Sequence, residues 1–293
     1  GTLTQADRAS VVAEINQRLQ ELVGLANSTD NKGEFLFGGF STRTKPVADS
    51  ATGFIYKGDQ GRREVQIAPN VRVTDANPGS EVFFAILNGN GTFSVAQGAG
   101  YTGTGVIDPG TVTDLSAWVP DTYTITFTSA STFEVHDSAL GLVTSGAYVE
   151  GSAIAFNGVQ TSITGDPALG DTFTVAASSN QDVFSTVRAV VSALESGDSI
   201  TRQNAVNSAL TDLDQAMENV LQVRAQVGAR LNTIESEVNL NADLELLIQQ
   251  DLSAVRDVDL TEVITLMNRQ LGALQAASQS FARVQNLSLF NFL

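Results

Sequence analysis

Hydrophobic residues recur at alternating four- and three-residue steps from residue 206 almost to the end of the chain. One frame of this pattern spans residues 206–255, and a second frame spans residues 260–281. Three polar or charged residues interrupt the first frame: Arg224, Asn241 and Glu245. A 3.5-residue repeat of this length is typical of a coiled-coil seam, which needs partner helices to bury it. The pattern therefore predicts long helices that take part in an assembly.

The start of the chain carries a shorter helical pattern. Thr4 and Asp7 have the spacing of an N-terminal capping box, and the apolar residues after them recur at helical steps. Turn-forming residues at 27–33 end the pattern. We therefore expect one helix over residues 4–28. Because the sequence does not begin with methionine, we also expect the natural start to lie upstream.

From residue 34 to residue 179, short runs of β-branched and aromatic residues alternate with clusters of Gly, Asn, Asp and Pro. The clearest run is 123–128, where apolar residues alternate with threonine. Such a series predicts antiparallel strands in a sandwich or barrel, with one β subdomain or two that divide near residues 98–110. The predicted strands are Phe54–Lys57, Arg63–Ala68, Val71–Thr74, Val82–Leu87, Thr92–Ala96, Tyr123–Thr128, Thr132–His136, Ala147–Glu150, Ala153–Phe156 and Thr172–Ala176.

Helical periodicity returns near Gln181. Ser179 and Asp182 have capping-box spacing, and Gly197 is a natural C-terminal stop for that helix. A long helix is then predicted from Ser199 to about residue 255. The break in phase after it, with Asp259 and Glu262 at capping distance, predicts a final helix through roughly residue 287.

Together these patterns predict an α+β protein. Long α-helical coiled-coil arms would carry an inserted, antiparallel β-rich outer region. The expected segments are a helix of the helical domain at 1–33, the β-rich region at 34–179, long helices of the helical domain at 180–258, and a C-terminal helix at 259–293.

The net charge of −16 and the presence of only three lysines limit the classes of partner. An acidic surface repels phosphates, so we expect no binding to nucleic acid or to anionic membranes. The sequence contains no cysteine, which excludes disulfides and thiolate chemistry. No apolar run approaches the roughly twenty residues that span a bilayer.

The candidate chemical motifs are weak. Residues 98–103 fit a dinucleotide-binding pattern, but predicted strands lie on both sides and no helix follows. His136 is the single histidine, which is too few for a histidine-based zinc site, and no nucleophile motif accompanies it. The pair Asp212 and Asp214 falls on different sides of a helix, so we interpret it as a solvated face. We therefore predict no catalytic, cofactor or metal site and no enzymatic activity.

The C-terminus concentrates apolar side chains that a free chain end cannot bury by itself, which is typical of an interaction site. We expect burial between subunits, and the alternative is a tail that docks on the chain's own core. The expected subunit-interaction residues are Leu260, Ile264, Met267, Leu271, Leu274, Phe281, Val284, Leu287, Leu289, Phe290 and Leu293.

Several segments together carry a resemblance to a known family. They are Phe35–Phe40, Tyr56–Arg63, Ile163–Pro167, Gly170–Val175, Val227–Asn232 and Leu287–Leu293. They resemble the exit from the first helix, the first β hairpin, the return to the helical arm and the C-terminal helix of the hook-associated junction proteins of the bacterial flagellin family. The resemblance covers nearly the whole chain.

The resemblance implies a structural protein that forms a ring of identical subunits between hook and filament. It adapts one to the other by subunit packing, with the C-terminal helix in the inner tube. The implied partners are flagellin, hook-associated protein 1, other copies of the chain and a flagellar export chaperone. The implied location is the extracellular flagellum, reached by the flagellar type III system without a cleaved signal peptide. Family members also have an N-terminal helical segment that pairs with the C-terminal helix. Without it, we expect the region after about Leu260 to be mostly disordered in the monomer.

Two other functions fit parts of the sequence. One is a flagellin-type subunit of the whole filament, which would share the terminal helices. The other is an adhesin on a flagellin-like scaffold, with a β domain that binds carbohydrate through exposed aromatic residues. The candidate aromatic residues are Tyr101, Trp118, Tyr123 and Tyr148.

Overall fold

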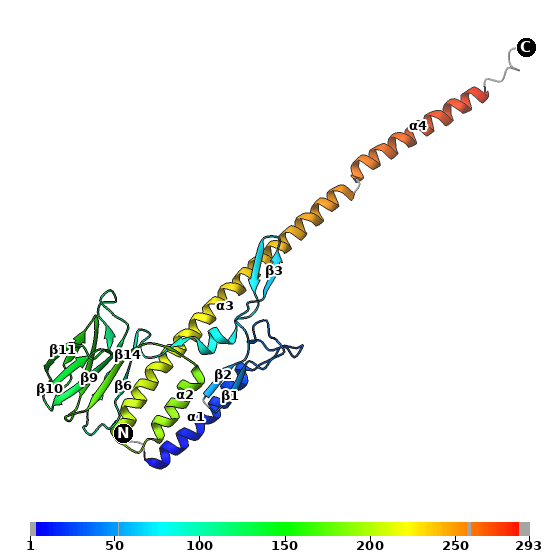
Figure 1. The fold of residues 1–293 in the computed structure, drawn as a ribbon. Helices are drawn as coiled ribbons and strands as arrows, with labels where there is room; N and C mark the ends of the chain where they lie inside the picture. The colour runs from blue at the N-terminus through cyan, green and yellow to red at the C-terminus, as the bar shows by residue number, and fades with distance from the viewer. Residues whose placement is uncertain (1–3, 52, 257–258, 287–293) are drawn as a thin grey trace, which may run out of the picture. The chain divides into compact units, whose positions relative to one another are not determined.

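The computed structural model describes residues 4–51, 53–256 and 259–286, and its described elements form an α+β fold (Figure 1). The chain divides into two compact units, Gly1–Asn232 and Thr233–Leu293. The helices are α1 Gln5–Ala26, α2 Val183–Glu195, α3 Ser199–Arg256 and α4 Leu260–Asn286. The second unit contains the end of α3 together with α4. The predicted α+β class is confirmed, whereas the four segment limits stay predictions.

Local hydrogen bonds explain where the first two helices begin. The Thr4 hydroxyl accepts the Asp7 N–H at 3.2 Å, and the Asp7 carboxylate accepts the Thr4 N–H at 3.1 Å, which confirms the predicted capping box. In α2 the cap is Asp182 itself, whose carboxylate accepts the Ser185 N–H at 2.7 Å. The predicted box of Ser179 with Asp182 is wrong, because residues 180–181 form strand β15 and the Ser179 N–H donates to Asn88 Oδ1.

The larger β region is a sandwich of two antiparallel sheets. One sheet has the order β11-β10-β9-β14-β6, and the other has the order β12-β13-β7 with β8 also paired to β13. The strands of the first sheet are β6 Phe93–Gln97, β9 Thr122–Ser129, β10 Thr132–His136, β11 Leu142–Ala147 and β14 Thr172–Ala177. The strands of the second sheet are β7 Val106–Ile107, β8 Thr111–Val112, β12 Ala153–Phe156 and β13 Val159–Thr164.

The alternation predicted at 123–128 places the core of this sandwich. Tyr123, Ile125 and Phe127 on β9 are fully buried, while the threonines between them are partly exposed. They pack with Phe173 from the adjacent strand β14 and with Phe93 from β6 of the same sheet. Since alternate side chains of a strand point to opposite faces, the sequence pattern defines which face lies inside.

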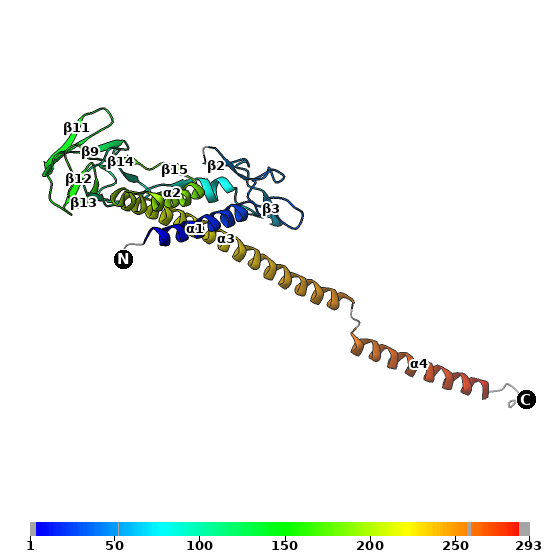
Figure 2. The ribbon, with the colours of Figure 1, turned by 90° about the horizontal axis from the view of Figure 1, so that it is seen from below.

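A second core joins the helices to small β elements. These elements are β1 Val47–Ser50 with β2 Gly53–Tyr56, β3 Glu64–Ala68 with β4 Val71–Thr74, and β5 Ile86–Leu87 with β15 Asn180–Gln181. Leu19 of α1, Phe184 of α2 and Ala216 of α3 are buried in this core. Figure 2 shows α1 and α2 beside the beginning of α3.

Some predicted elements are wrong. Residues predicted as the strand Val82–Leu87 form a π-helical turn, η1 Ser80–Phe84, followed by β5. This apolar run lacks period-two alternation, and its Phe83 and Phe84 rings pack against Phe184. The predicted strand Ala147–Glu150 is also wrong, because β11 ends at Ala147. Residues Leu260–Asn286 form a helix, so the expected disorder after Leu260 is not what the structure describes.

Candidate assembly surfaces

The apolar residues of α4 lie in solvent. They recur at helical steps along the helix, and their exposed fractions range from 44% at Val263 to 72% at Leu260. The predicted interaction residues of this helix are Leu260, Ile264, Met267, Leu271, Leu274, Phe281 and Val284. The other four predicted residues, Leu287, Leu289, Phe290 and Leu293, lie outside the described residues. The structure thus exposes the apolar residues of α4, and their role in subunit contacts stays a prediction.

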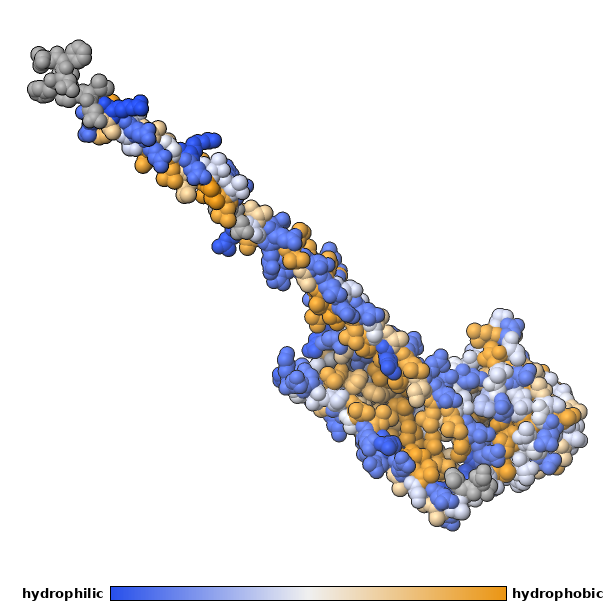
Figure 3. All heavy atoms as spheres, turned by 180° about the vertical axis from the view of Figure 1, so that it is seen from behind, coloured by the Kyte–Doolittle hydropathy of each residue, from blue (hydrophilic) through white to orange (hydrophobic). Residues whose placement is uncertain are grey.

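The end of α3 has the same character. Val238, Ile248 and Leu252 are each at least half exposed, and Val255 is 84% exposed. Figure 3 shows hydrophobic side chains among hydrophilic ones along these helices. Fully burying one large aliphatic side chain contributes roughly 1.5–3 kcal/mol, so a helix that leaves many of them in water gains strongly from a partner.

The beginning of α3 packs through an unexpected face. Its predicted apolar frame includes Leu210 and Met217, which are 50% and 61% exposed. The side that touches the rest of the first unit carries small and polar residues instead, with Asn204, Ala209 and Ala216 buried. At about 100° per residue, these two sets lie on different faces of the helix. The apolar frame of α3 is therefore left largely free, and polar groups attach the helix to its neighbours.

Asn204 is the central polar group of this attachment. Only 3% of this residue is exposed, and its Oδ1 accepts the N–H of Ile107, at 2.9 Å. Its Nδ2 donates to Gln97 Oε1 at 2.9 Å and to the carbonyl of Gly105 at 3.1 Å. One side chain on α3 thus meets hydrogen-bonding groups on β6, on β7 and on the loop between them. This contact couples the β sandwich to the helix.

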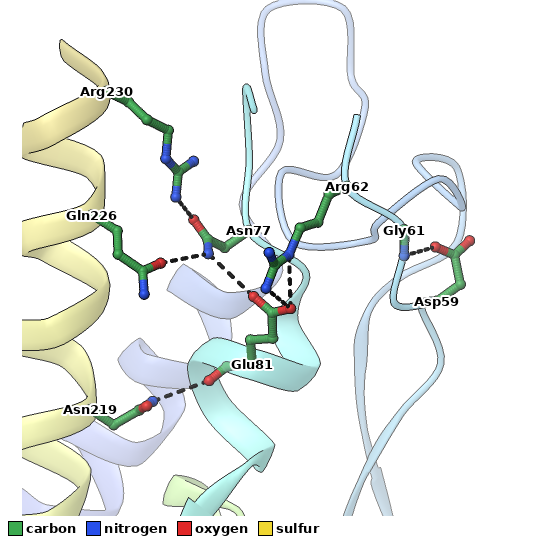
Figure 4. Close-up of polar contacts among 8 residues, drawn as sticks. All are labelled: Asp59, Gly61, Arg62, Asn77, Glu81, Asn219, Gln226 and Arg230. Atoms are coloured by element: carbon green, nitrogen blue, oxygen red, sulfur yellow. Dashed lines mark hydrogen bonds and ion pairs between the residues drawn. The ribbon is translucent and has the colours of Figure 1, made fainter. Parts of the chain in front are cut away.

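A second polar cluster lies further along α3, at the base of the β3–β4 hairpin (Figure 4). The Asn219 Nδ2 donates to the backbone carbonyls of Glu81 and Val82 in η1, at 3.1 and 3.0 Å. The Arg230 guanidinium donates to the Thr74 carbonyl at 3.1 Å and also to Asn77 Oδ1.

The same cluster reaches away from the helix. The Asn77 Nδ2 donates to Glu81 Oε2 at 3.3 Å, and Arg62 forms an ion pair with the other carboxylate oxygen of Glu81 at 2.6 Å. Beyond Arg62, Asp59 accepts the N–H groups of Phe40 and Gly61 and the Ser41 hydroxyl. Hydrogen bonds from the Ser41 side chain, then from these backbone groups, lower the pKa of Asp59. The Asp59 carboxylate therefore stabilises the loop that leads into the β3–β4 hairpin.

Asp212 differs from its predicted environment. The sequence indicated a solvated carboxylate, but Asp212 Oδ1 accepts the N–H of Gly89 at 2.6 Å, and Oδ2 accepts from Gln181 Nε2 at 3.4 Å. Burial raises the pKa of Asp212, against the lowering effect of these two hydrogen bonds. Sequence reasoning missed the attachment face, although polar residues seven apart, at 212, 219 and 226, carry its signal.

The weak chemical motifs have structural surroundings. The Gly-rich segment 98–105 connects β6 to β7, and the Asp171 carboxylate accepts the N–H groups of Thr102 and Gly103 at 2.8 and 2.9 Å. His136 ends β10, with Nε2 at 3.6 Å from a Glu134 carboxylate oxygen. Over the described ranges, no group of three or more His, Cys, Asp or Glu side chains is placed to hold a metal ion. Nor is any helix of those ranges long and apolar enough to cross a membrane.

The aromatic residues considered for carbohydrate binding serve the core instead. Tyr123 is 1% exposed, and Tyr101, Trp118 and Tyr148 are partly buried and pack against the sandwich core. Their rings pair with buried phenylalanines, as in the edge contact of Tyr148 with Phe127 at 5.1 Å. The expectation of an exposed aromatic platform is therefore wrong.

Comparisons with known proteins agree on one group of relatives. Residues 210–293 match the family model described as the bacterial flagellin C-terminal helical region. The chain is 24% identical to flagellar hook-associated protein 3 of Escherichia coli K12 over 290 residues, which are 99% of this chain and 68% of that protein.

Solved structures extend the comparison. The crystal structure of FlgL from Xanthomonas campestris is 36% identical, with a TM-score of 0.79 over 86% of this chain and 84% of that one. The structure of the flagellar junction protein FlgL from Legionella pneumophila is 31% identical, with a TM-score of 0.79 over 87% of this chain and 81% of that one.

Proposed function

Because this chain belongs to the flagellar hook-associated protein 3 family, we propose that it is a structural subunit of the junction between hook and filament. It is a component of the bacterial flagellum. In the proposed role, copies of the chain form a ring and adapt the hook to the filament by packing alone, without catalysis.

The observation that carries this proposal is the row of exposed apolar residues on α4. In the monomer Leu260, Leu274 and Phe281 are more than half exposed. Association that buries this apolar surface is therefore favourable. Neighbouring helices, from other copies and from the adjoining subunits of the flagellum, would cover this row. Each large side chain that becomes buried contributes roughly 1.5–3 kcal/mol before the cost of ordering.

The β sandwich has a different part in this proposal. Its core is closed, and the Asn204 contacts fix it to α3. In the proposed assembly the sandwich faces outward and does not line the helical tube. The proposed partners are hook-associated protein 1 on the hook side, flagellin on the filament side and other copies of this chain. A flagellar export chaperone would cover the apolar helix before export by the type III system to the extracellular flagellum.

The experiment that tests this proposal is immunogold electron microscopy of flagella from the source cells. An antibody raised against residues 34–179 recognises the β region, which differs from the shared terminal helices. A single narrow band of gold where the hook meets the filament is the expected result. Cells that lack the gene provide the control for antibody specificity.

Label along the whole filament would instead identify a flagellin-type subunit, which is the second candidate function. The match of residues 210–293 to the flagellin C-terminal region is the observation that favours this candidate. Absence of label from the flagellum would contradict both functions.

A further inference from the structure

The tip of the β10–β11 hairpin holds a leucine in an unusual backbone conformation. Leu140 has a φ of +64° and is 82% exposed. The left-handed region costs a residue with a Cβ roughly 1–2 kcal/mol, and glycine adopts it without this cost. Asn157 is the only other non-glycine residue with positive φ in the part of the chain that the structure describes. A strained residue that also holds an apolar side chain in water points to a function for that side chain.

The turn around Leu140 is firmly held. The Asp137 Oδ1 accepts the N–H groups of Ala139 and Gly141 at 3.0 and 2.7 Å, and the Asp137 N–H donates to the Gly141 carbonyl at 3.0 Å. The Ser138 N–H donates to Asp121 Oδ2 at 3.3 Å. A tip that is ordered before binding loses little conformational entropy on binding. The hairpin therefore presents Leu140 as a preformed projection.

A cavity that suits such a projection lies elsewhere in the same unit. It has a volume of about 380 Å³ and is lined by residues of β6, α2 and α3, by Asn88 and Gly89, and by Pro109. Its apolar lining residues are small: Val95, Ala96, Pro109, Ala189, Ala205 and Ala209. The charged group of its wall, Asp212, already accepts hydrogen bonds from Gly89 and Gln181. The cavity thus offers an apolar wall to a leucine side chain.

The projection and the cavity lie on opposite sides of the sandwich. In the described strand order, β11 is one edge of its sheet and β6 is the other (Figure 1). At about 4.8 Å between neighbouring strands, these edges are roughly 19 Å apart. If the tip of one copy contacts the cavity of the next, the copies associate head to tail. Such heterologous contacts generate rings or helical arrays.

Charge favours the same arrangement between copies. The chain has a net charge of −16, so two copies repel each other over most of their surface. Residues 138–149, which include the tip and β11, contain no charged side chain. Leu142 in this segment is also 61% exposed. The uncharged tip is therefore a place where two copies can approach without that repulsion.

We propose that Leu140 of one copy inserts into the cavity between β6, α2 and α3 of the neighbouring copy. This contact would join the β sandwiches around the ring. The inference rests on the proposed function, since it requires a ring of identical subunits. Leu140 is then a docking residue, and the cavity is a site that only a second copy of the chain completes.

Introduced cysteines test this contact, because the chain contains no cysteine of its own. The full-length double variant Leu140→Cys with Thr201→Cys places one thiol at the tip and one at the exposed rim of the cavity. Flagella carrying this variant are treated with a short bis-maleimide reagent, and a ladder of cross-linked copies is expected. The matched control is Leu169→Cys with Thr201→Cys, because Leu169 is 73% exposed on another loop of the sandwich. This control should give no ladder.

A glycine variant separates docking from folding. Leu140→Gly suits the left-handed backbone, so the variant should fold at least as well as the native chain. We expect at least about a tenfold loss of chain in the junction, from the loss of one buried leucine contact. Incorporation equal to the native chain would overturn the proposal. So would a control ladder as strong as that of the test pair, or cross-linking of the Leu140→Cys thiol to a different protein.

The failure of this inference is distinguishable from failure of the proposed function. If gold label marks the junction but the Leu140→Cys and Thr201→Cys pair gives no ladder there, the docking contact is wrong and the function stands. If the label is absent from the junction, the proposed function fails and the docking contact fails with it.

Discussion

The side-chain carbonyl of Asn204 on α3 accepts a hydrogen bond from the backbone N–H of Ile107 on β7, at 2.9 Å. Asn204 also donates to Gln97 and to the Gly105 carbonyl. An Asn204→Ala variant leaves these partners without their hydrogen bonds in a buried place. We expect the free energy of unfolding to fall by about 1–3 kcal/mol.

Urea unfolding followed by the fluorescence of Trp118 measures this loss, because the single tryptophan packs against the sandwich core. The matched control is Gln203→Ala, an exposed neighbour on the same helix. Equal unfolding midpoints for the two variants would show that Asn204 does not couple α3 to the sandwich.

Asp212 predicts a specific dependence of stability on pH. Burial raises its pKa above the ordinary value of 3.8, so the folded state binds the proton more tightly than the unfolded state. The contribution of Asp212 to stability is therefore full below 3.8 and is lost as the pH rises through the folded pKa. Relative to Asp212→Asn, the native chain should become less stable over this rise.

Denaturation of both chains at a series of pH values that rises from 3.8 checks the sign, because a raised carboxyl pKa lies above that ordinary value. The matched control is Asp214→Asn, which removes one charge at an exposed position two residues away. A constant difference between the native chain and Asp212→Asn would contradict the prediction.

Arg230 holds the base of the β3–β4 hairpin against α3 through Thr74 and Asn77. Replacement by alanine removes charge-assisted hydrogen bonds and leaves the mostly buried Asn77 with one partner fewer. We expect a loss of about 1.5–3 kcal/mol in the free energy of unfolding. Faster hydrogen exchange is also expected at the β4 amides.

Arg224→Ala is the control for Arg230→Ala, since Arg224 is an exposed arginine on the same helix. Arg230→Lys gives a finer test. A lysine keeps the charge but lacks the planar fork that donates in two directions, so it should restore only part of the stability. Full rescue by lysine would mean that charge alone holds the hairpin.

Periodicity alone predicted much of this fold. The steps of three and four residues predicted α1, α3 and α4, and the alternation at 123–128 predicted the buried face of β9. These elements follow from sequence because burial on one face repeats with the period of the element. The strand predicted at 82–87 is wrong because this segment has no such period. A continuous apolar run is compatible with either a strand or a helical turn.

The attachment face of α3 could not be predicted in this way. Asn204 and Asp212 have polar side chains that a hydrophobic pattern assigns to solvent, and their partners are backbone groups far away in sequence. Only the fold brings Ile107 and Gly89 to this helix. The apolar frame at Leu210 and Met217 was predicted from periodicity but lies exposed in this chain. Apolar periodicity identifies a face that needs a partner, and it does not identify that partner.

The exposed row on α4 gives the sharpest test of assembly. Met267 and Leu271 are 53% and 51% exposed, so their replacement by glutamine, a good helix former, should change the free energy of unfolding by less than about 0.5 kcal/mol. If subunit contacts bury both side chains, the double variant loses roughly 3–6 kcal/mol per subunit in the assembled state. That loss corresponds to at least about a hundredfold weaker incorporation.

Immunoblots of isolated flagella, normalised to hook protein, measure incorporation of the Met267 and Leu271 double variant, and swimming motility provides a second readout. Ser280→Gln, on the other side of the helix, should leave both readouts unchanged. Normal incorporation of the double variant would show that this row is not a subunit contact, whereas equal loss with Ser280→Gln would mean that any change on α4 blocks export or folding.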